Sequence, residues 1–587
     1  MYPKMKKIVT QLRVAVRAHQ QGELQSAAAI YQKILTRQPN HADALHLLGV
    51  VLAETGRYDT ALACIGEAIR SGGPRPAYCA NLGRVFMRQQ RFTEAVACFR
   101  QALRHNPLDA GVTMQLARGL AAVGNLTEAE TAFAQAAAID PGMHEAHFNL
   151  GILWTMQQRV PDACRSYERA LKAWPDYADA HNNLANLLHA QGDTGTAQFH
   201  YESACRLTPD QPRSWFNLGR LFQDTDRIPA AHKLYDFVLA RWPDHAAARI
   251  NLGNCLRGEG QSHEAIEHYR RVIAHDPEDV DAHWNLSLAL LQTGQMTEGW
   301  KEYDWRFQRW PRLVREFSQP LWNGEMLDGR RILLHAEQGL GDTLQFARFA
   351  SIAKDRGGIV ILECHSTLVR LLRSLRGVDE VVARGCDLPE FDCHAPLLSL
   401  PAILGTLPVE VPYIATDKAL SNRWRERVRT GADGLFRIGL AWAGDRRHGN
   451  DRHRSMAPEY LKGLSGLESV RFFSLQKDHA PVPGLLPHLD PINMELTDFA
   501  DTAAIMHHLD LIISVDTSVA HLAGALARPV WTLLPFSADW RWLDSHDDSS
   551  WYPTMRLFRQ PQPQDWTSVM AKVRAELIPK LAQVVLP

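Results

Sequence analysis

The residues best suited to do chemistry lie in the stretch LIISVDTSVAHLAGALARPVWTLLP, residues 511–535. An apolar run ends there in Asp516, Thr517 and Ser518, and a helix pattern of small residues follows with one imidazole, that of His521. We expect a buried parallel strand that meets a helix start at Asp516. Unpaired N–H groups at a helix start, with two hydroxyls beside them, suit a diphosphate, and His521 lies nearly one turn further on. Helix capping is the alternative for Asp516 and Thr517, but capping does not account for His521.

A second chemical motif, EQGLGDTLQFARF, follows the apolar run RILLHA of residues 331–336. Gly339 and Gly341 lack side chains and would let a substrate approach the backbone closely. Asp342 is the candidate base that takes a proton from an acceptor hydroxyl. Asp342 with Gln345 three residues later also fits a capping box, so a purely structural role stays open.

Basic groups that suit a leaving phosphate follow two further apolar runs, residues 436–444 and 470–478. The loop after the first run supplies Gly444, His448, Arg452, Arg454 and Ser455. Lys477 stands at the end of the second run. We expect Arg454 with Ser455, and after them Lys477, to contact phosphate, because cations on loops at strand ends are more than a solvated surface.

Strands and helices must position these groups, and the second half of the chain alternates strand-like runs with helical patterns. This alternation predicts an α/β fold with two Rossmann-like domains that face a cleft, at residues 313–430 and 431–587. The candidate residues then lie at the carboxyl edges of the strands, where ligands of such folds bind. The last helical stretch, residues 565–584, is expected to cross back and tie the two domains together.

The first half repeats one motif with a period of 34 residues. Prolines keep the phase at Pro39, Pro107, Pro141, Pro175, Pro209, Pro243 and Pro277. Twelve residues before each slot stands an alanine: Ala27, Ala61, Ala95, Ala129, Ala163, Ala197, Ala231 and Ala265. Small residues let antiparallel helices approach, a large residue four positions later fills the gap, and proline stops the second helix. The pattern resembles the tetratricopeptide repeat (TPR) and predicts an α-solenoid over residues 1–312, with eight repeats and a divergent ninth.

A carboxamide recurs on the first helix of most repeats: Asn81, Asn149, Asn183, Asn217, Asn251 and Asn285, with Gln115 in the remaining slot. One carboxamide can pair with a peptide backbone through both a donor and an acceptor, so a ladder of them would hold an extended protein chain. Alternatively, these side chains satisfy backbone groups between helices. The ladder resembles that of eukaryotic O-GlcNAc transferase, whose TPR superhelix receives protein substrates.

Composition excludes several classes of protein. Lys plus Arg is 64 and Asp plus Glu is 65, a balance that argues against a sequence-blind nucleic-acid binder. The nine cysteines form no CxxC pair, and Cys364-His365 and Cys393-His394 lack the spacing of a metal site. Gln11 and Arg13 interrupt the apolar stretch that a signal peptide would need, and no run is long enough for a transmembrane segment. We therefore expect a cytoplasmic protein without a cofactor, and an oligomer stays open.

The stretch Asp516-Thr517-Ser518-Val519-Ala520-His521-Leu522-Ala523-Gly524-Ala525-Leu526, with Pro529, resembles the donor-diphosphate signature of heptosyltransferase-like glycosyltransferases of the GT-B fold. In that family a Gly-Asp pair after the first strand precedes a helix facing the acceptor, as Gly341-Asp342 does here. With GWKEYDWRF, GLAWAG and DWRWL, the chain resembles bacterial proteins that fuse TPRs to such a module. The resemblance implies a nucleotide-sugar donor and no metal. The family's phosphate-binding lysine has no unambiguous counterpart here.

Three functions remain compatible with the sequence. The first is a glycosyltransferase whose TPR half selects a protein acceptor; relatives suggest flagellin or another surface protein. The second is a heptosyltransferase-like enzyme that acts on a lipopolysaccharide core or another glycan. The third is a non-catalytic TPR scaffold, against which Asp342, Asp516, Thr517 and His521 argue.

Overall fold

A computed structural model describes residues 2–584 except residues 409, 433, 478–483, 485, 487, 488 and 545. The chain divides into two compact units, Met1–Leu234 and Tyr235–Pro587, and each is described by itself. The predicted fold class is confirmed: a helical solenoid is followed by parallel sheets with helices. The predicted domain bounds stay a prediction.

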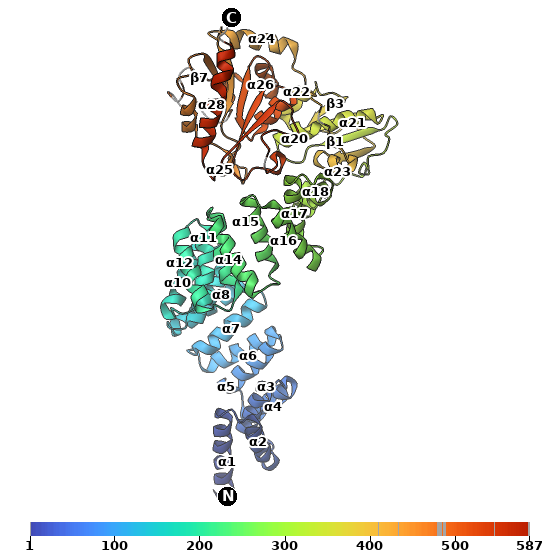
Figure 1. Cartoon of the computed structure of the whole chain (residues 1–587). Helices are drawn as coiled ribbons and strands as arrows, with labels where there is room; N and C mark the ends of the chain where they lie inside the picture. Colours follow the sequence, from blue (N-terminus) through green and yellow to red (C-terminus); the bar gives the residue numbers. More distant parts are fainter. Residues whose placement is uncertain are drawn as a thin grey trace. The chain divides into compact units, whose positions relative to one another are not determined.

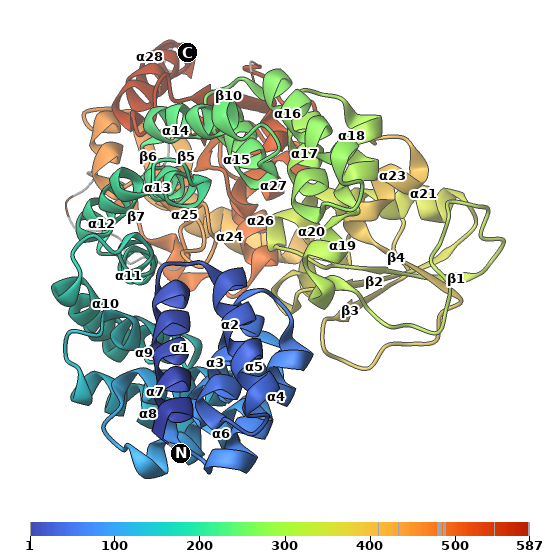
Figure 2. The same ribbon diagram turned by 90° about the horizontal axis from the view of Figure 1, so that it is seen from below.

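The first unit consists of helices that lie side by side as antiparallel pairs (Figures 1 and 2). They are α1 (Tyr2–Gln20), α2 (Leu24–Arg37), α3 (Ala42–Glu54), α4 (Tyr58–Gly72), α5 (Pro76–Arg88), α6 (Phe92–His105), α7 (Ala110–Ala122), α8 (Leu126–Ile139), α9 (His144–Met156), α10 (Val160–Ala173), α11 (Ala178–Ala190), α12 (Thr194–Leu207) and α13 (Pro212–Asp224). Helix α14 (Ile228–Arg241) contains the boundary between the units.

Close packing within each helix pair explains the repeated small residues. All eight alanines of the predicted series are fully buried. A Cβ on Gly151 would lie 2.5 Å from Cε1 of Tyr167, sixteen residues later, and one on Gly83 would lie 2.6 Å from Cε1 of Phe99. The period therefore encodes contacts between neighbouring helices, as the sequence predicts.

The second unit begins with more repeat helices: α15 (Ala246–Gly258), α16 (Ser262–His275), α17 (Val280–Gln292), α18 (Met296–Tyr303) and the short α19 (Arg306–Arg309). The ninth repeat packs directly on the α/β part of this unit. The ring of Trp300 lies 5.2 Å from that of Trp540 and 5.5 Å from that of Phe346. Arg306 is fully buried and donates from Nε to Oε1 of Glu337 over 2.7 Å.

A four-stranded parallel sheet follows, in the order β3-β2-β1-β4. Its strands are β1 (Arg331–His335), β2 (Ile359–Cys364), β3 (Glu380–Ala383) and β4 (Cys393–Pro396). The accompanying helices are α20 (Leu340–Phe346), α21 (Ala350–Asp355), α22 (Val369–Leu372) and α23 (Leu400–Leu404). Figure 2 shows these strands together, with α21 and α23 beside them. Chain order reverses between β1 and β4, so the loop after β1 opens at a topological switch point.

A second parallel sheet has six strands in the order β10-β9-β8-β5-β6-β7. They are β5 (Phe436–Ala441), β6 (Val470–Ser474), β7 (Leu489–Asp490), β8 (Leu511–Val515), β9 (Val530–Leu534) and β10 (Met555–Arg559). Its helices are α24 (Lys418–Arg429), α25 (Asp451–Arg454), α26 (Phe499–Met506), α27 (Ser518–Ala525) and α28 (Trp566–Val584). This is the doubly wound order of a dinucleotide-binding fold, with its switch point between β5 and β8.

Two contacts join the sheets within this unit. Helices α20 and α27 pack together, and one hydrophobic core includes residues of both layers. Arg348 is buried and donates to the carbonyl oxygens of Pro408 and Trp551, at 2.9 and 3.0 Å. Thus the two switch points are held near each other by a shared core.

The expected role of the last helix is wrong. Helix α28 does not tie the two sheets together: its main contacts are with residues 458–464 and β10, and it lies beside the six-stranded sheet (Figure 1). Val573 and Leu577 are fully buried in the core of that sheet. An amphipathic helix docks wherever its apolar face finds the nearest complementary surface, and its own sheet supplies that surface.

Within the described residues, every helix lacks the length or the apolar character needed to cross a membrane.

Candidate active site

The predicted chemical groups gather in one cleft of about 840 Å³ in the second unit. It lies at the switch points of both sheets and has the size of a small-molecule site. The predicted residues that line it are Gly339, Gly341, Asp342, Gly444, His448, Arg454, Lys477, Asp516, Thr517, Ser518 and His521. Their roles stay predictions, but the fold brings together groups up to about 180 positions apart in the chain.

The start of α27 is the floor of the cleft on the six-stranded side. Strand β8 ends at Val515, and Thr517 caps α27: its Oγ1 accepts the N–H of Val519 over 3.3 Å. Ser514 and Thr517 exchange a further hydrogen bond of 3.1 Å between their hydroxyls. Capping and ligand contact are compatible here, because Thr517 caps the helix and also lines the cleft together with Ser518 and Val519.

His521 is a buried, oriented imidazole. Its Nδ1 lies 3.1 Å from the hydroxyl of Tyr552, its ring stacks on Trp542, and its Nε2 lies 3.9 Å from Oδ1 of Asp516. Burial, followed by the charges of Arg541, Arg348 and Arg454, lowers the pKa of His521 well below its usual value. The imidazole is therefore neutral at pH 7. In the tautomer whose Nδ1 accepts from Tyr552, Nε2 carries a proton that can be donated to an anion.

Gly341 makes room for the imidazole of His521. A Cβ on Gly341 would lie 2.9 Å from Cδ2 of His521. Gly341 also lines the cleft, so its role in letting a substrate approach stays a prediction. Gly341 and His521 thereby place the loop after β1 directly against the start of α27.

Asp516 is an acid under strong electrostatic influence. Burial, and then the neighbouring charge of Asp539, raise its pKa to about 6. Arg454 and Arg541 act in the opposite direction. Because the folded-state value exceeds that of the unfolded chain, protonation of Asp516 stabilises the fold below about pH 4, and this contribution is lost as the pH rises through about 6.

The carboxylate of Asp342 has two partners, a backbone N–H in its own loop and the guanidinium of Arg541, which the sequence analysis did not identify. Its Oδ2 accepts the N–H of Gly339 over 2.8 Å, and its Oδ1 pairs with Arg541. Asp342 is thus the third helical residue of α20 and caps back onto Gly339; it is not itself the N-cap. Gln345, the expected capping partner, instead accepts from Nε of Arg541 over 2.7 Å.

The loop after β5 separates two of the predicted phosphate ligands. Arg454 lines the cleft, and a Cβ on Gly444 would lie 2.5 Å from its Nη2, which explains the glycine. Ser455 is not among the residues that line the cleft. Its hydroxyl accepts the N–H of Gly444 over 2.9 Å and donates to Asp451 over 2.7 Å. Ser455 therefore holds the loop in place.

The carboxamide series is largely engaged within the solenoid. Asn149 and Asn285 donate to the carbonyl oxygens of Glu145 and Asp281 four residues earlier, at 2.7 and 2.8 Å. In the other positions Asn81 pairs with His46, Asn183 accepts from Arg213, Asn217 is buried against Asn182, and Asn251 donates to Tyr235. Each amide therefore has at least one structural partner, Asn81 also accepts from Arg84, and those that are half-buried keep further capacity for a ligand.

One cavity in the first unit includes two members of this series. It measures about 440 Å³, and Gln115, Arg118, Glu145 and Asn149 supply its polar lining, beside Phe148 and Tyr177. Aromatic faces with amide groups between them suit an apolar side chain and its peptide backbone. The first unit thus has one defined pocket that includes two members of the series, and the ladder as a whole stays a prediction.

Models of two families match the chain. TPR models match residues 18–82, 81–144, 114–164, 156–212, 216–261 and 243–294. The model described as glycosyltransferase family 9 (heptosyltransferase) matches residues 469–541. The chain thus joins tetratricopeptide repeats to a segment, the family 9 segment, that is similar to glycosyltransferase family 9 (heptosyltransferase).

The chain is also similar to a curated protein and to solved structures. The chain is 25% identical over 320 residues to Protein FlbA of Caulobacter vibrioides, an alignment that covers 48% of this chain and 52% of FlbA. The chain thus spans about half the length of this curated relative. Similar solved structures include the APC/C hetero-tetramer Cut9-Hcn1 (19% identity, TM-score 0.33, 46% of this chain and 52% of that chain). A tetratricopeptide repeat protein from Parabacteroides merdae is another (15% identity, TM-score 0.33, 42% and 98%).

The family 9 segment contains much of the cleft. Lys477, Asp516, Thr517, Ser518 and His521 fall inside residues 469–541. Asp342 and Arg454 lie outside the matched range and join the site only through the tertiary structure. Lys477 is exposed and donates to the carbonyl oxygen of Thr497 over 3.3 Å.

Sequence reasoning missed several polar groups of this cleft. His365, Arg384, Asp539 and Arg541 are among those that line it as well. Arg541 was within reach of sequence analysis, because DWRWL places a cation between tryptophans shortly after the apolar run of β9.

Within the described residues, His, Cys, Asp and Glu side chains form no group that could hold a metal ion.

Proposed function

We propose that the chain transfers a sugar from a nucleotide-sugar donor to a hydroxyl of a protein that the TPR helices bind. One observation carries the proposal. The cleft joins the start of α27, with Thr517, Ser518 and His521, to the loop of Asp342 at the switch points of two Rossmann-type sheets. This arrangement supports a GT-B glycosyltransferase that works without a metal, and a cytoplasmic location stays part of the proposal.

The proposed chemistry distributes roles across the cleft. The diphosphate of the donor contacts the first turn of α27, with Nε2 of His521 and the guanidinium of Arg454 as donors. Asp342 takes the proton from the acceptor hydroxyl, whose oxygen then bonds to the anomeric carbon as the bond to the nucleoside diphosphate breaks. Arg541 holds Asp342 in place and adds positive charge near the leaving group.

Replacing His521 by alanine tests the donor site. The variant should lose one hydrogen bond to a charged group, about 1.5–3 kcal/mol, which weakens nucleotide binding about 10- to 150-fold. Calorimetry with a panel of nucleoside diphosphates measures this affinity. His365→Ala is the matched control, because His365 lines the same cleft from the four-stranded sheet. Equal affinities of the two variants would remove His521 from the donor site.

Replacing Gln115 and Asn149 together by alanine tests the acceptor. Loss of two neutral amide contacts should weaken peptide binding by about 1–3 kcal/mol and reduce protein glycosylation by about 5- to 150-fold. Hydrolysis of the nucleotide sugar without acceptor should stay unchanged, since the pocket lies in the first unit. Mass spectrometry of modified proteins measures the first effect, and nucleotide release measures the second.

A matched control for this double variant is Gln198→Ala with Phe199→Ala, both of which lie outside the pocket on α12. Phe199 is 58% exposed, so its loss costs little stability. An unchanged pattern of glycosylated proteins in the pocket variant would contradict a protein acceptor bound by these helices and would favour a glycan or lipid.

A further inference from the structure

A second cavity of the unit Tyr235–Pro587 measures about 460 Å³ and shares no lining residue with the cleft. It lies on the segment that connects the two sheets. Residues 412–416 and the first turns of α24 form one wall, and the ends of α26 and α27 form the other. Its lining residues are Pro412, Ile414, Ala415, Thr416, Lys418, Ser421, Asn422, Arg425, His507, Leu526 and Arg528.

The charge of this cavity is one-sided. Lys418, Arg425, Arg528 and His507 line it, and none of the described lining residues is acidic. Across the part of the chain that the structure describes, no carboxylate forms an ion pair with Lys418, Arg425 or Arg528. Asp417, which adjoins the cavity in sequence, is occupied in capping α24 through the N–H of Leu420. No lining residue therefore supplies a carboxylate to these cations.

Arg528 is the fixed element of this group. Its Nη2 donates to the carbonyl oxygen of Leu509 over 2.7 Å, and its Nε is buried without a hydrogen-bond partner. Burial lowers the pKa of Arg528, and Asp510, which is itself paired with Arg437, only partly offsets this. Burial, followed by Arg528 and Arg425, likewise lowers the pKa of His507. A held, partly desolvated guanidinium is the donor that binds phosphate oxygens best.

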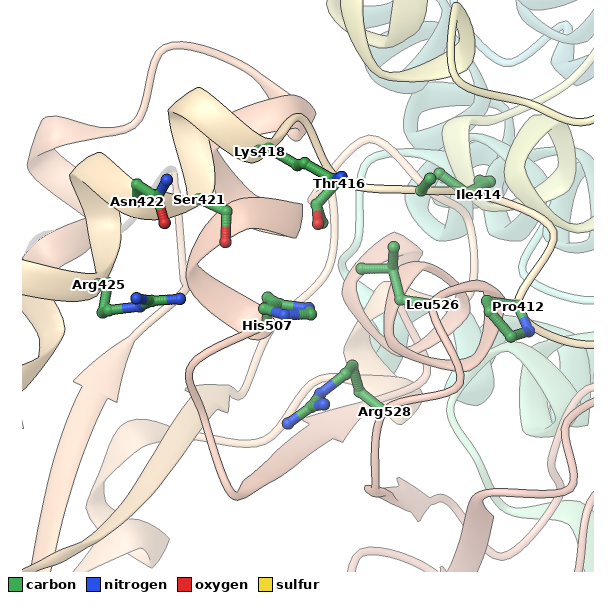
Figure 3. Close-up of a pocket in the computed structure, with 11 residues that line it drawn as sticks. Pro412, Ile414, Thr416, Lys418, Ser421, Asn422, Arg425, His507, Leu526 and Arg528 are labelled. Carbon is green, nitrogen blue, oxygen red and sulfur yellow. The ribbon is translucent and has the colours of Figure 1, made fainter.

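The opposite end of the cavity is apolar. In Figure 3, Arg425 reaches toward the ring of His507 and Arg528 extends toward the same end, whereas Pro412, Ile414 and Leu526 lie at the other end. Ser421 does not add a free hydroxyl, because it is bonded to His508 over 2.9 Å. A ligand that fits both ends has an anionic group and a less polar organic part.

We propose that this cavity binds the phosphoryl group of a small phosphorylated organic molecule. The phosphoryl oxygens contact Arg425, Arg528 and His507, and the organic part lies on Pro412, Ile414 and Leu526. Lys418 adds charge at the rim. Because the cavity contains both the connecting segment and the helices of the six-stranded sheet, the bound ligand joins these two parts. The same chemistry is offered by a soluble phosphate ester and by the headgroup of an anionic lipid.

Calorimetry with phenyl phosphate on the full chain tests the binding site. Arg425→Glu should weaken the binding of phenyl phosphate at least tenfold. Arg423→Glu is the matched control, because it makes the same charge change on an exposed residue of the same helix that does not line the cavity. Phosphate binding in the donor cleft contributes equally to both variants. Arg528→Gln should act like Arg425→Glu, and a melting temperature near that of the parent chain confirms its fold.

Vesicles distinguish the two sources of the phosphoryl group. Co-sedimentation with phosphatidylglycerol–phosphatidylcholine vesicles that Arg425→Glu abolishes and Arg423→Glu preserves supports a lipid headgroup. Phenyl phosphate binding that depends on Arg425, without sedimentation, supports a soluble ester. The proposal is overturned if Arg425→Glu and Arg423→Glu bind phenyl phosphate with equal affinity and also sediment equally with the vesicles.

Discussion

Asp342→Asn is expected to reduce glycosyl transfer by about 10²–10⁴-fold, the usual contribution of a positioned general base. The amide keeps the size of the carboxylate, and its oxygen can still accept the N–H of Gly339, so α20 keeps its cap. Nucleotide affinity should change little, because the donor groups lie on the other sheet. Single-turnover transfer and nucleotide calorimetry together measure the two effects.

Loss of the pair with Arg541 is the competing explanation for such a defect, and Asp539→Asn controls for it. Asp539 also lines the cleft and accepts from Arg541 over 2.8 Å. This variant removes one carboxylate from the same guanidinium without touching the proposed base. If Asp539→Asn lowers transfer as much as Asp342→Asn, the pair with Arg541 matters and Asp342 is not the base. Near-normal transfer by Asp342→Asn would leave this residue only its structural role.

Arg541→Met should lower the free energy of unfolding of the second unit by about 3 kcal/mol. The side chain is 9% exposed and pairs with Asp342 and Asp539, and it also bonds to Gln345. Methionine fills the space but leaves two neighbouring carboxylates without a cation. The expected loss in the free energy of unfolding is at the lower end of the range for breaking a buried ion pair, because Asp539 is 36% exposed and keeps part of its hydration. Urea unfolding measures it.

A matched substitution of an exposed arginine on the rim of the cleft distinguishes the effect of burial on stability from the effect of removing a positive charge. Arg447→Met removes the same charge from a cleft-lining residue whose side chain is 90% exposed. The expected change in the free energy of unfolding is below about 0.5 kcal/mol. An Arg541 variant as stable as the Arg447 variant would show that the buried ion pairs do not hold the two sheets together.

Much of the architecture was predictable because its signals are local. The 34-residue period requires only that each helix pair meets its neighbour, and the fully buried alanines and the Gly151–Tyr167 contact are direct products of that spacing. The apolar runs at 331–336, 436–444 and 511–515 became strands β1, β5 and β8. Strands β3, β4 and β7 were missed because they are only two to four residues long, and β10 because Arg556 and Arg559 interrupt its apolar pattern.

The sequence by itself determined the repeats, the parallel strands and the placement of polar groups at strand ends, since helix and strand periodicities act over a few residues. Only the tertiary structure decided which distant groups meet. The pair of Asp342 and Arg541 joins residues 199 positions apart, and the contact of Gly341 with His521 joins the two sheets. The tertiary structure also decided that the hydroxyl of Ser455 bonds within its own loop and that α28 packs on the six-stranded sheet. No local period encodes such contacts, because they depend on how the finished layers pack.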